Sequence, residues 1–218
     1  MHAVIFDFDG LVLDTELPRL RAWQEIYQQY GCTLEDADWQ HIIGTADHFD
    51  PYALLCQRAT CQLPSEDEVR ATKTARELEL IHAERTLPGV LEWLDDAERL
   101  DLGVAIASTS PADWVEGHLE RLGLRHRFAV ISCYAEPLRP KPAPDVYLAA
   151  LEALGVGPSD AVAAEDSPHG IAAAKAAGLF CVAVPNQLTG PLDLSAADVV
   201  VPSLADLPLA ALVDRFAS

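Results

Sequence analysis

The sequence predicts an α/β fold: a Rossmann-like parallel sheet with helices on both faces, plus a small α-helical cap domain inserted after the first strand. Three observations predict it. From residue 90 onward, short apolar runs alternate with helical patterns, which is typical of βαβ units around a parallel sheet. A separate apolar run lies at residues 3–6, and residues 15–84 show only helical periods. We therefore expect a catalytic core of residues 1–14 and 85–218 and a helical cap of residues 15–84.

Each expected strand is a continuous apolar run, because parallel strands covered on both faces carry apolar side chains on both sides. Polar residues or turn signals end each run. The expected strands span residues 3–6, 104–107, 129–132, 161–164, 181–184 and 199–201. The helices expected between and after them span residues 90–100, 112–122, 145–154, 171–177 and 207–216.

The inserted segment begins with an amphipathic pattern. Leu20, Trp23, Ile26 and Tyr27 fall on one helical face, and Gly31 follows as a stop signal. Ligands of open α/β sheets bind beyond the carboxyl ends of the strands, so an insertion after the first strand is placed to act as a lid. Further helices are expected at residues 39–43, 52–59 and 65–82, the last starting with the capping-box spacing of Ser65 and Glu68.

Composition excludes several classes of function. The 218 residues include 15 basic and 34 acidic ones, a formal net charge of −19. Such a charge argues against nucleic-acid binding and against docking on anionic membranes. The five scattered cysteines show no metal-ligand or disulfide spacing. The sequence shows neither a signal-peptide pattern nor a bilayer-spanning run, so we expect a cytoplasmic protein, and a monomer because no interface stripe is evident.

Polar residues that could carry chemistry follow four of the expected strands. Clustered carboxylates repel one another, and a divalent cation such as Mg²⁺, which prefers oxygen ligands, removes that repulsion. A lysine and hydroxyl groups beside them could hold a phosphoryl group. The candidates are Asp7, Asp9, Ser108, Thr109, Lys141, Glu165 and Asp166. Ser110 and Ser167, each followed by proline, are interpreted instead as helix N-caps.

These motifs resemble those of the haloacid dehalogenase-like phosphohydrolase superfamily. Asp7-Phe8-Asp9-Gly10-Leu11-Val12-Leu13-Asp14-Thr15-Glu16 is similar to its first signature, and Ser108 to its second motif. Lys141 resembles the third motif, and Glu165 with Asp166 the fourth. All four occur in the family's order across nearly the whole chain. The helical insertion resembles the small cap of the β-phosphoglucomutase and sugar-phosphate phosphatase branch.

The resemblance implies a role for each motif residue. Asp7 would be the nucleophile and a Mg²⁺ ligand, and Asp9 the general acid and base, with its backbone carbonyl on the metal. Glu165 and Asp166 would complete the metal ligands. Ser108, with Thr109 beside it, and Lys141 would hold the phosphoryl group.

The expected function is a Mg²⁺-dependent phosphatase that hydrolyses a small phosphate ester, such as a sugar or polyol phosphate, through an aspartyl-phosphate. A phosphosugar mutase is an alternative, although Arg19 stands where related mutases carry histidine. A non-catalytic Mg²⁺-binding regulatory module is a second alternative. Substrate selectivity is assigned to cap residues: Glu16, Arg19, Thr45 and His48.

Overall fold

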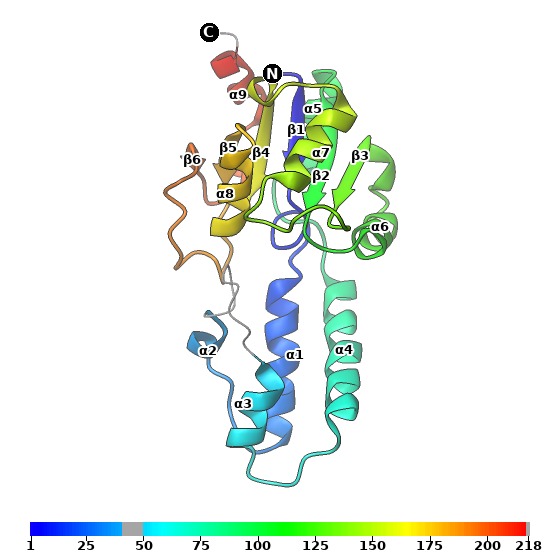
Figure 1. Ribbon diagram of the computed structural model, residues 1–218, viewed down its shortest axis with the longest axis vertical. Coiled ribbons are helices and arrows are strands. Elements are labelled where there is room, and N and C mark those ends of the chain that lie inside the picture. Colours follow the sequence, from blue (N-terminus) through cyan, green and yellow to red (C-terminus); the bar gives the residue numbers. More distant parts are fainter. Residues whose placement is uncertain (41–49, 217–218) are drawn as a thin grey trace. The chain divides into compact units, whose positions relative to one another are not determined.

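The computed structural model describes residues 1–40 and 50–216 (Figure 1). The chain forms two compact units. Met1–Leu13 and Thr86–Ser218 make up the first, which we call the sheet unit. Asp14–Arg85 make up the second, which we call the helical unit.

The sheet unit is built on a six-stranded parallel sheet with the order β3-β2-β1-β4-β5-β6. The first strand in the sequence therefore lies in the middle, between β2 and β4. The order reverses direction there, and such a switch point leaves a crevice at the carboxyl ends of the strands. The strands are β1 (Ala3–Phe6), β2 (Gly103–Ser108), β3 (Val130–Cys133), β4 (Ala161–Glu165), β5 (Phe180–Ala183) and β6 (Val199–Val200).

Both faces of the sheet carry helices, which confirms the predicted fold class (Figure 1). Every residue of β1 is fully buried, because its side chains alternate between two cores. Ala3 and Ile5 belong to the apolar core beneath α7 (Asp145–Leu154) and α8 (Pro168–Ala176). On the other face, the Phe6 ring packs edge-on against Trp93 of α5 (Val90–Arg99), with centroids 5.9 Å apart.

Helix α8 begins three residues before the predicted start, because its first turn, Pro168-His169-Gly170, carries no apolar periodic signal. The Ser167 hydroxyl accepts a hydrogen bond from the Gly170 N–H at 3.2 Å, so the predicted N-cap is confirmed. The remaining helices of this unit are α6 (Ala112–Arg121), α9 (Leu209–Phe216) and the short 3₁₀ turns η1 (Arg125–Arg127), η2 (Pro158–Asp160) and η3 (Leu204–Asp206).

Among its described residues, the helical unit contains helices and the loops between them, and no strand. The predicted apolar face of α1 (Glu16–Gln29) is buried, and this helix packs against α4 (Glu66–Ala83). Helix α4 has the predicted capping box, in which the Ser65 hydroxyl accepts from the Glu68 N–H and the Glu68 carboxylate accepts from the Ser65 N–H. The helices are α1 (Glu16–Gln29), α2 (Asp36–Gln40), α3 (Pro51–Arg58) and α4 (Glu66–Ala83); the helix predicted at 39–43 falls partly outside the described residues.

Within residues 1–40 and 50–216, every helix is too short or too polar to cross a bilayer. All five cysteines are free thiols, and Cys181 is buried in the sheet unit.

Candidate active site

Three charged side chains meet where β1 and β4 end. Asp7 follows β1 directly, and its N–H donates to the Ala164 carbonyl at 2.9 Å, which extends the pairing with β4. Glu165 is the last residue of β4. The Lys141 ammonium, from the loop before α7, donates to Asp7 Oδ1 and to Glu165 Oε1, each at 2.6 Å. The structure thus places an ion triad at the switch point of the sheet, with the lysine side chain 8% exposed.

Glu165 is fully buried and its carboxylate is held on both oxygens. Besides Lys141, the Tyr147 hydroxyl donates to Oε1 at 2.5 Å, and the Asp166 N–H donates to Oε2 at 3.2 Å. A Cβ at position 170 would lie 1.9 Å from Oε2, so only glycine leaves room for this carboxylate beside α8. Glu165 therefore fixes Lys141 in place.

The burial of these charges shifts their proton affinities. Burial raises the pKa of the Asp7 carboxyl from its ordinary 3.8 to about 7, because Lys141 offsets only part of the cost of removing the charge from water. Burial alone lowers the pKa of Lys141, but the adjoining carboxylates raise it more, and the net shift is upward. Burial and the Glu165 carboxylate raise the pKa of Tyr147, which keeps its hydroxyl a donor.

The acids at this edge are suited to a hard divalent cation. One carboxylate oxygen from each of Asp7, Glu165 and Asp166 lies within 4.8 Å of the other two, and all three residues are buried. A single lysine leaves this group with an excess of negative charge. Since Mg²⁺ prefers oxygen ligands and neutralises such a cluster, the donor set fits that ion.

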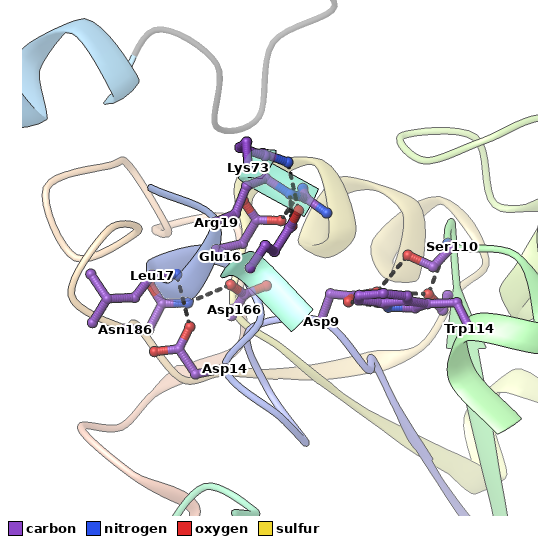
Figure 2. Close-up of polar contacts among 12 residues, drawn as sticks. Asp9, Asp14, Glu16, Leu17, Arg19, Lys73, Ser110, Trp114, Asp166 and Asn186 are labelled. Carbon is purple, nitrogen blue, oxygen red and sulfur yellow. Dashed lines mark hydrogen bonds and ion pairs between the residues drawn. The ribbon is translucent and has the colours of Figure 1, made fainter. Parts of the chain in front are cut away.

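Asp166 has a partner that sequence reasoning missed. The Asn186 amide donates to Asp166 Oδ2 at 2.7 Å (Figure 2). It also donates to the Gly10 carbonyl at 3.3 Å. Its Oδ1 accepts from the N–H groups of Leu188 and Thr189, both at 2.9 Å, so the amide orientation is fixed. Asn186 follows the carboxyl end of β5. Polar residues after four of the other strands are the predicted candidates, and the same criterion applied to β5 would have identified Asn186.

Gly10 lets the loop after β1 pass close to Asp166. Its φ of +83° is in the left-handed region. A Cβ there would lie 2.4 Å from Asp166 Oδ2. A side chain at position 10 would thus displace this carboxylate.

Asp9 lies among hydroxyl groups and an indole. The Ser110 hydroxyl donates to Asp9 Oδ2 at 2.6 Å, and Ser108 does so at 3.4 Å. The Trp114 indole N–H donates to Oδ1 at 3.0 Å (Figure 2). Thr109 is exposed in the same loop, and within the described part of the chain its side chain makes no hydrogen bond.

The prediction that Ser110 caps α6 is wrong. The helix begins at Ala112, with Pro111 in the N-cap position and no side-chain cap. The Ser110 hydroxyl lies instead against Asp9, and its hydrogen bond to that carboxylate at 2.6 Å holds the side chain away from the first turn of α6. Tyr147 and Trp114 were also missed, because both reach the acids from helices whose sequence pattern indicates only core packing.

In the helical unit, two predicted specificity residues share an ion network. Arg19 Nη1 donates to Glu16 at 2.8 Å, and its Nε donates to Glu77 at 2.9 Å. Lys73 binds the other oxygen of Glu77 at 2.5 Å, and the Glu77 side chain is 8% exposed. Arg19 thereby links α1 to α4. Thr45 and His48 lie outside the described residues.

Comparisons with known proteins show the family of this chain. Residues 4–184, which contain all the predicted core site residues, match the haloacid dehalogenase-like hydrolase family. The Bacillus subtilis (strain 168) protein named "Putative phosphatase YhcW" is 40% identical over 220 residues, covering 100% of this chain and 99% of that protein. Validoxylamine A 7'-phosphate phosphatase of Streptomyces hygroscopicus subsp. limoneus is 30% identical, with 93% and 94% covered. The crystal structure of CbbY from Rhodobacter sphaeroides with xylulose-(1,5)bisphosphate has a TM-score of 0.77 at 30% identity, covering 97% and 99%.

Proposed function

This chain belongs to the haloacid dehalogenase-like hydrolases, and we propose that it is a Mg²⁺-dependent phosphatase of a small phosphorylated metabolite. The observation that carries the proposal is the buried triad of Asp7, Lys141 and Glu165 at the switch point. Asp166 lies beside the triad, and Asp9 follows Asp7 by two residues in the sequence. A carboxylate paired with a lysine, next to further acids, suits attack on a phosphate that binds with a divalent cation.

In the proposed reaction Asp7 is the nucleophile. A carboxylate oxygen of Asp7 attacks phosphorus as the bond from phosphorus to the ester oxygen breaks, and Asp9 gives its proton to that oxygen. Asp9 then takes a proton from the water that hydrolyses the aspartyl-phosphate and frees Asp7. Lys141, Ser108 and Thr109 bind the phosphoryl oxygens, while Asp7, Glu165, Asp166 and the Asp9 carbonyl would hold Mg²⁺. The cation, when bound, offsets the negative charge of the transferring phosphoryl group.

The relatives support a small phosphorylated metabolite as substrate. One is named for the phosphate ester validoxylamine A 7'-phosphate, and the structural relative was crystallised in complex with xylulose-(1,5)bisphosphate. We therefore propose a sugar or polyol phosphate for this chain. We also propose that residues 15–84 act as a cap domain that selects it, with Glu16, Arg19, Thr45 and His48 as specificity residues, and that the protein is a cytoplasmic monomer.

Incubation with a panel of sugar and polyol phosphates tests the function. We expect release of inorganic phosphate with Mg²⁺, loss of release after chelation with EDTA, and recovery with excess Mg²⁺, because the acids repel an anionic ester without a cation. A mutase would instead form an isomerised ester in excess of free phosphate when primed with a bisphosphate. A regulatory module would release no phosphate from any member of the panel.

Asn186→Ala should weaken metal binding. The amide holds Asp166 and the Gly10 carbonyl, and loss of such an outer partner lowers metal affinity by about 10–100-fold. The Mg²⁺ concentration for half-maximal activity, and Mg²⁺ affinity by calorimetry, should both change by this factor. Gln187→Ala, at the exposed neighbouring position, is the matched control. Equal Mg²⁺ affinity in both variants would show that Asn186 does not support the metal site.

A further inference from the structure

Asp9 accepts hydrogen bonds on both carboxylate oxygens, and one donor is a tryptophan. Trp114 Nε1 donates to Oδ1 at 3.0 Å, and the Ser110 hydroxyl donates to Oδ2 at 2.6 Å (Figure 2). A carboxylate held on both oxygens cannot rotate without losing a donor. The contacts therefore fix the direction in which Asp9 points.

The indole is itself aimed by packing. Trp114 lies in the first turn of α6, and its ring meets the ring of His118 edge-on, with centroids 4.4 Å apart and planes at 78°. His118 is 5% exposed and stacks on Phe8 at 6.3 Å and 26°. We call Phe8, His118 and Trp114 the aromatic clamp. Because Phe8 precedes Asp9 in the chain, the clamp holds both the backbone beside Asp9 and its carboxylate.

We propose that Trp114 is a positioning residue for the acid–base group Asp9, acting through the hydrogen bond from its indole N–H. The inference rests on the proposed function. An indole N–H can only donate, so Oδ1 stays an acceptor throughout the reaction. The Ser110 hydroxyl donates or accepts as required, which leaves Oδ2 as the oxygen through which Asp9 gives its proton to the ester oxygen and takes one from water.

The contact can be tested without any activity measurement. The chain has four tryptophans and so four indole N–H signals in a ¹H–¹⁵N spectrum of the labelled protein. Trp114→Phe removes and thereby assigns one of them. In Asp9→Asn that signal should move upfield more than the other three, because a neutral amide accepts a weaker hydrogen bond than a carboxylate. An unmoved signal would overturn the proposal.

The positioning role is tested by the leaving group. Trp114→Phe keeps an aromatic ring on His118 and removes the N–H donor. For an alkyl phosphate, whose leaving oxygen needs a proton, we expect kcat/KM to fall by about 10–100-fold, the size of loss that a misplaced acid causes. For p-nitrophenyl phosphate, whose leaving group departs unprotonated, we expect a loss of less than about threefold. Glu120→Gln, exposed on the same helix, should leave both values unchanged.

A double-mutant cycle excludes a merely structural effect. If Trp114 acts through Asp9, adding Trp114→Phe to Asp9→Asn should lower the residual rate by less than about twofold, since the two residues form one unit. Equal losses for both esters, or fully additive losses in the cycle, would overturn the proposal. If the parent protein releases phosphate from neither ester, the proposed function fails, and the indole signals still decide whether Trp114 holds Asp9.

Discussion

Asp7→Asn should abolish turnover, with a loss in kcat of at least about 10⁴-fold, as expected when a catalytic nucleophile is removed. An amide nitrogen or oxygen does not attack phosphorus as a carboxylate does, so no aspartyl-phosphate forms. Phosphate release is the direct measurement. Acid-quenched parent protein should also carry a phosphoryl group on Asp7 by mass spectrometry, and the variant should carry none.

The same substitution should not unfold the protein. Burial already raises the pKa of Asp7 to about 7, which means that the folded site penalises the charged carboxylate. A neutral side chain of the same shape avoids this penalty, and its carbonyl oxygen can still accept from Lys141. We expect the metal-free variant to melt at the temperature of the parent or above it.

Asp101→Asn is the matched control for this change. Asp101 is exposed at a positive φ of 54°, a conformation that asparagine adopts readily, and it lies at the opposite end of β2 from the proposed site. The activity of the Asp101→Asn variant should equal that of the parent protein. Normal turnover in Asp7→Asn would remove the nucleophile assignment and with it the proposed mechanism.

The sheet was predictable because burial on both faces leaves a simple pattern. The run at residues 3–6 has no polar member, and its four residues are all fully buried in β1. The same rule placed Asp7 and Glu165 correctly at strand ends, since the residue after a buried run is held by the strand before it. The order of the strands brings these two ends together, and parallel topology made that convergence predictable.

Side chains that enter the site from helices were not predictable in this way. Tyr147 and Trp114 occupy positions that the helical period assigns to packing, and only tertiary structure shows that their polar atoms reach Glu165 and Asp9. Ser110 was misassigned for a related reason. The Ser-Pro pattern predicts a cap at both Ser110 and Ser167. Ser167 does cap its helix, whereas the Ser110 hydroxyl binds the Asp9 carboxylate instead.

Lys141→Met should both destabilise the protein and abolish its activity. Lys141 is the cation between Asp7 and Glu165, and its removal leaves two buried carboxyl groups side by side without a positive partner. Breaking a buried pair in this way costs about 3–5 kcal/mol, because the remaining charge has lost its partner. The free energy of unfolding from urea titration measures this cost. Phosphate release should be lost as well, since no ammonium remains to bind the phosphoryl oxygens.

Lys175→Met is a matched control with the same chemistry at the surface. Lys175 also contacts a carboxylate at 2.6 Å, that of Asp198, but about a third of each side chain is exposed. Water and salt screen such a pair, so its loss should cost less than about 1 kcal/mol and leave activity intact. A similar cost for both lysines would show that burial does not set the strength of the Lys141 pair.

The double variant Lys141→Met with Glu165→Gln separates the structural task of Lys141 from its catalytic one. The glutamine is neutral and can still accept from the Tyr147 hydroxyl, so the repulsion between Asp7 and position 165 disappears. Stability should then recover by a large part of the loss in Lys141→Met, whereas phosphate release should not return. Recovery of both would mean that the ammonium serves only to neutralise Glu165. Recovery of stability alone, with phosphate release retained in the single variant Glu165→Gln, would show that the Lys141 charge also acts on the phosphoryl group.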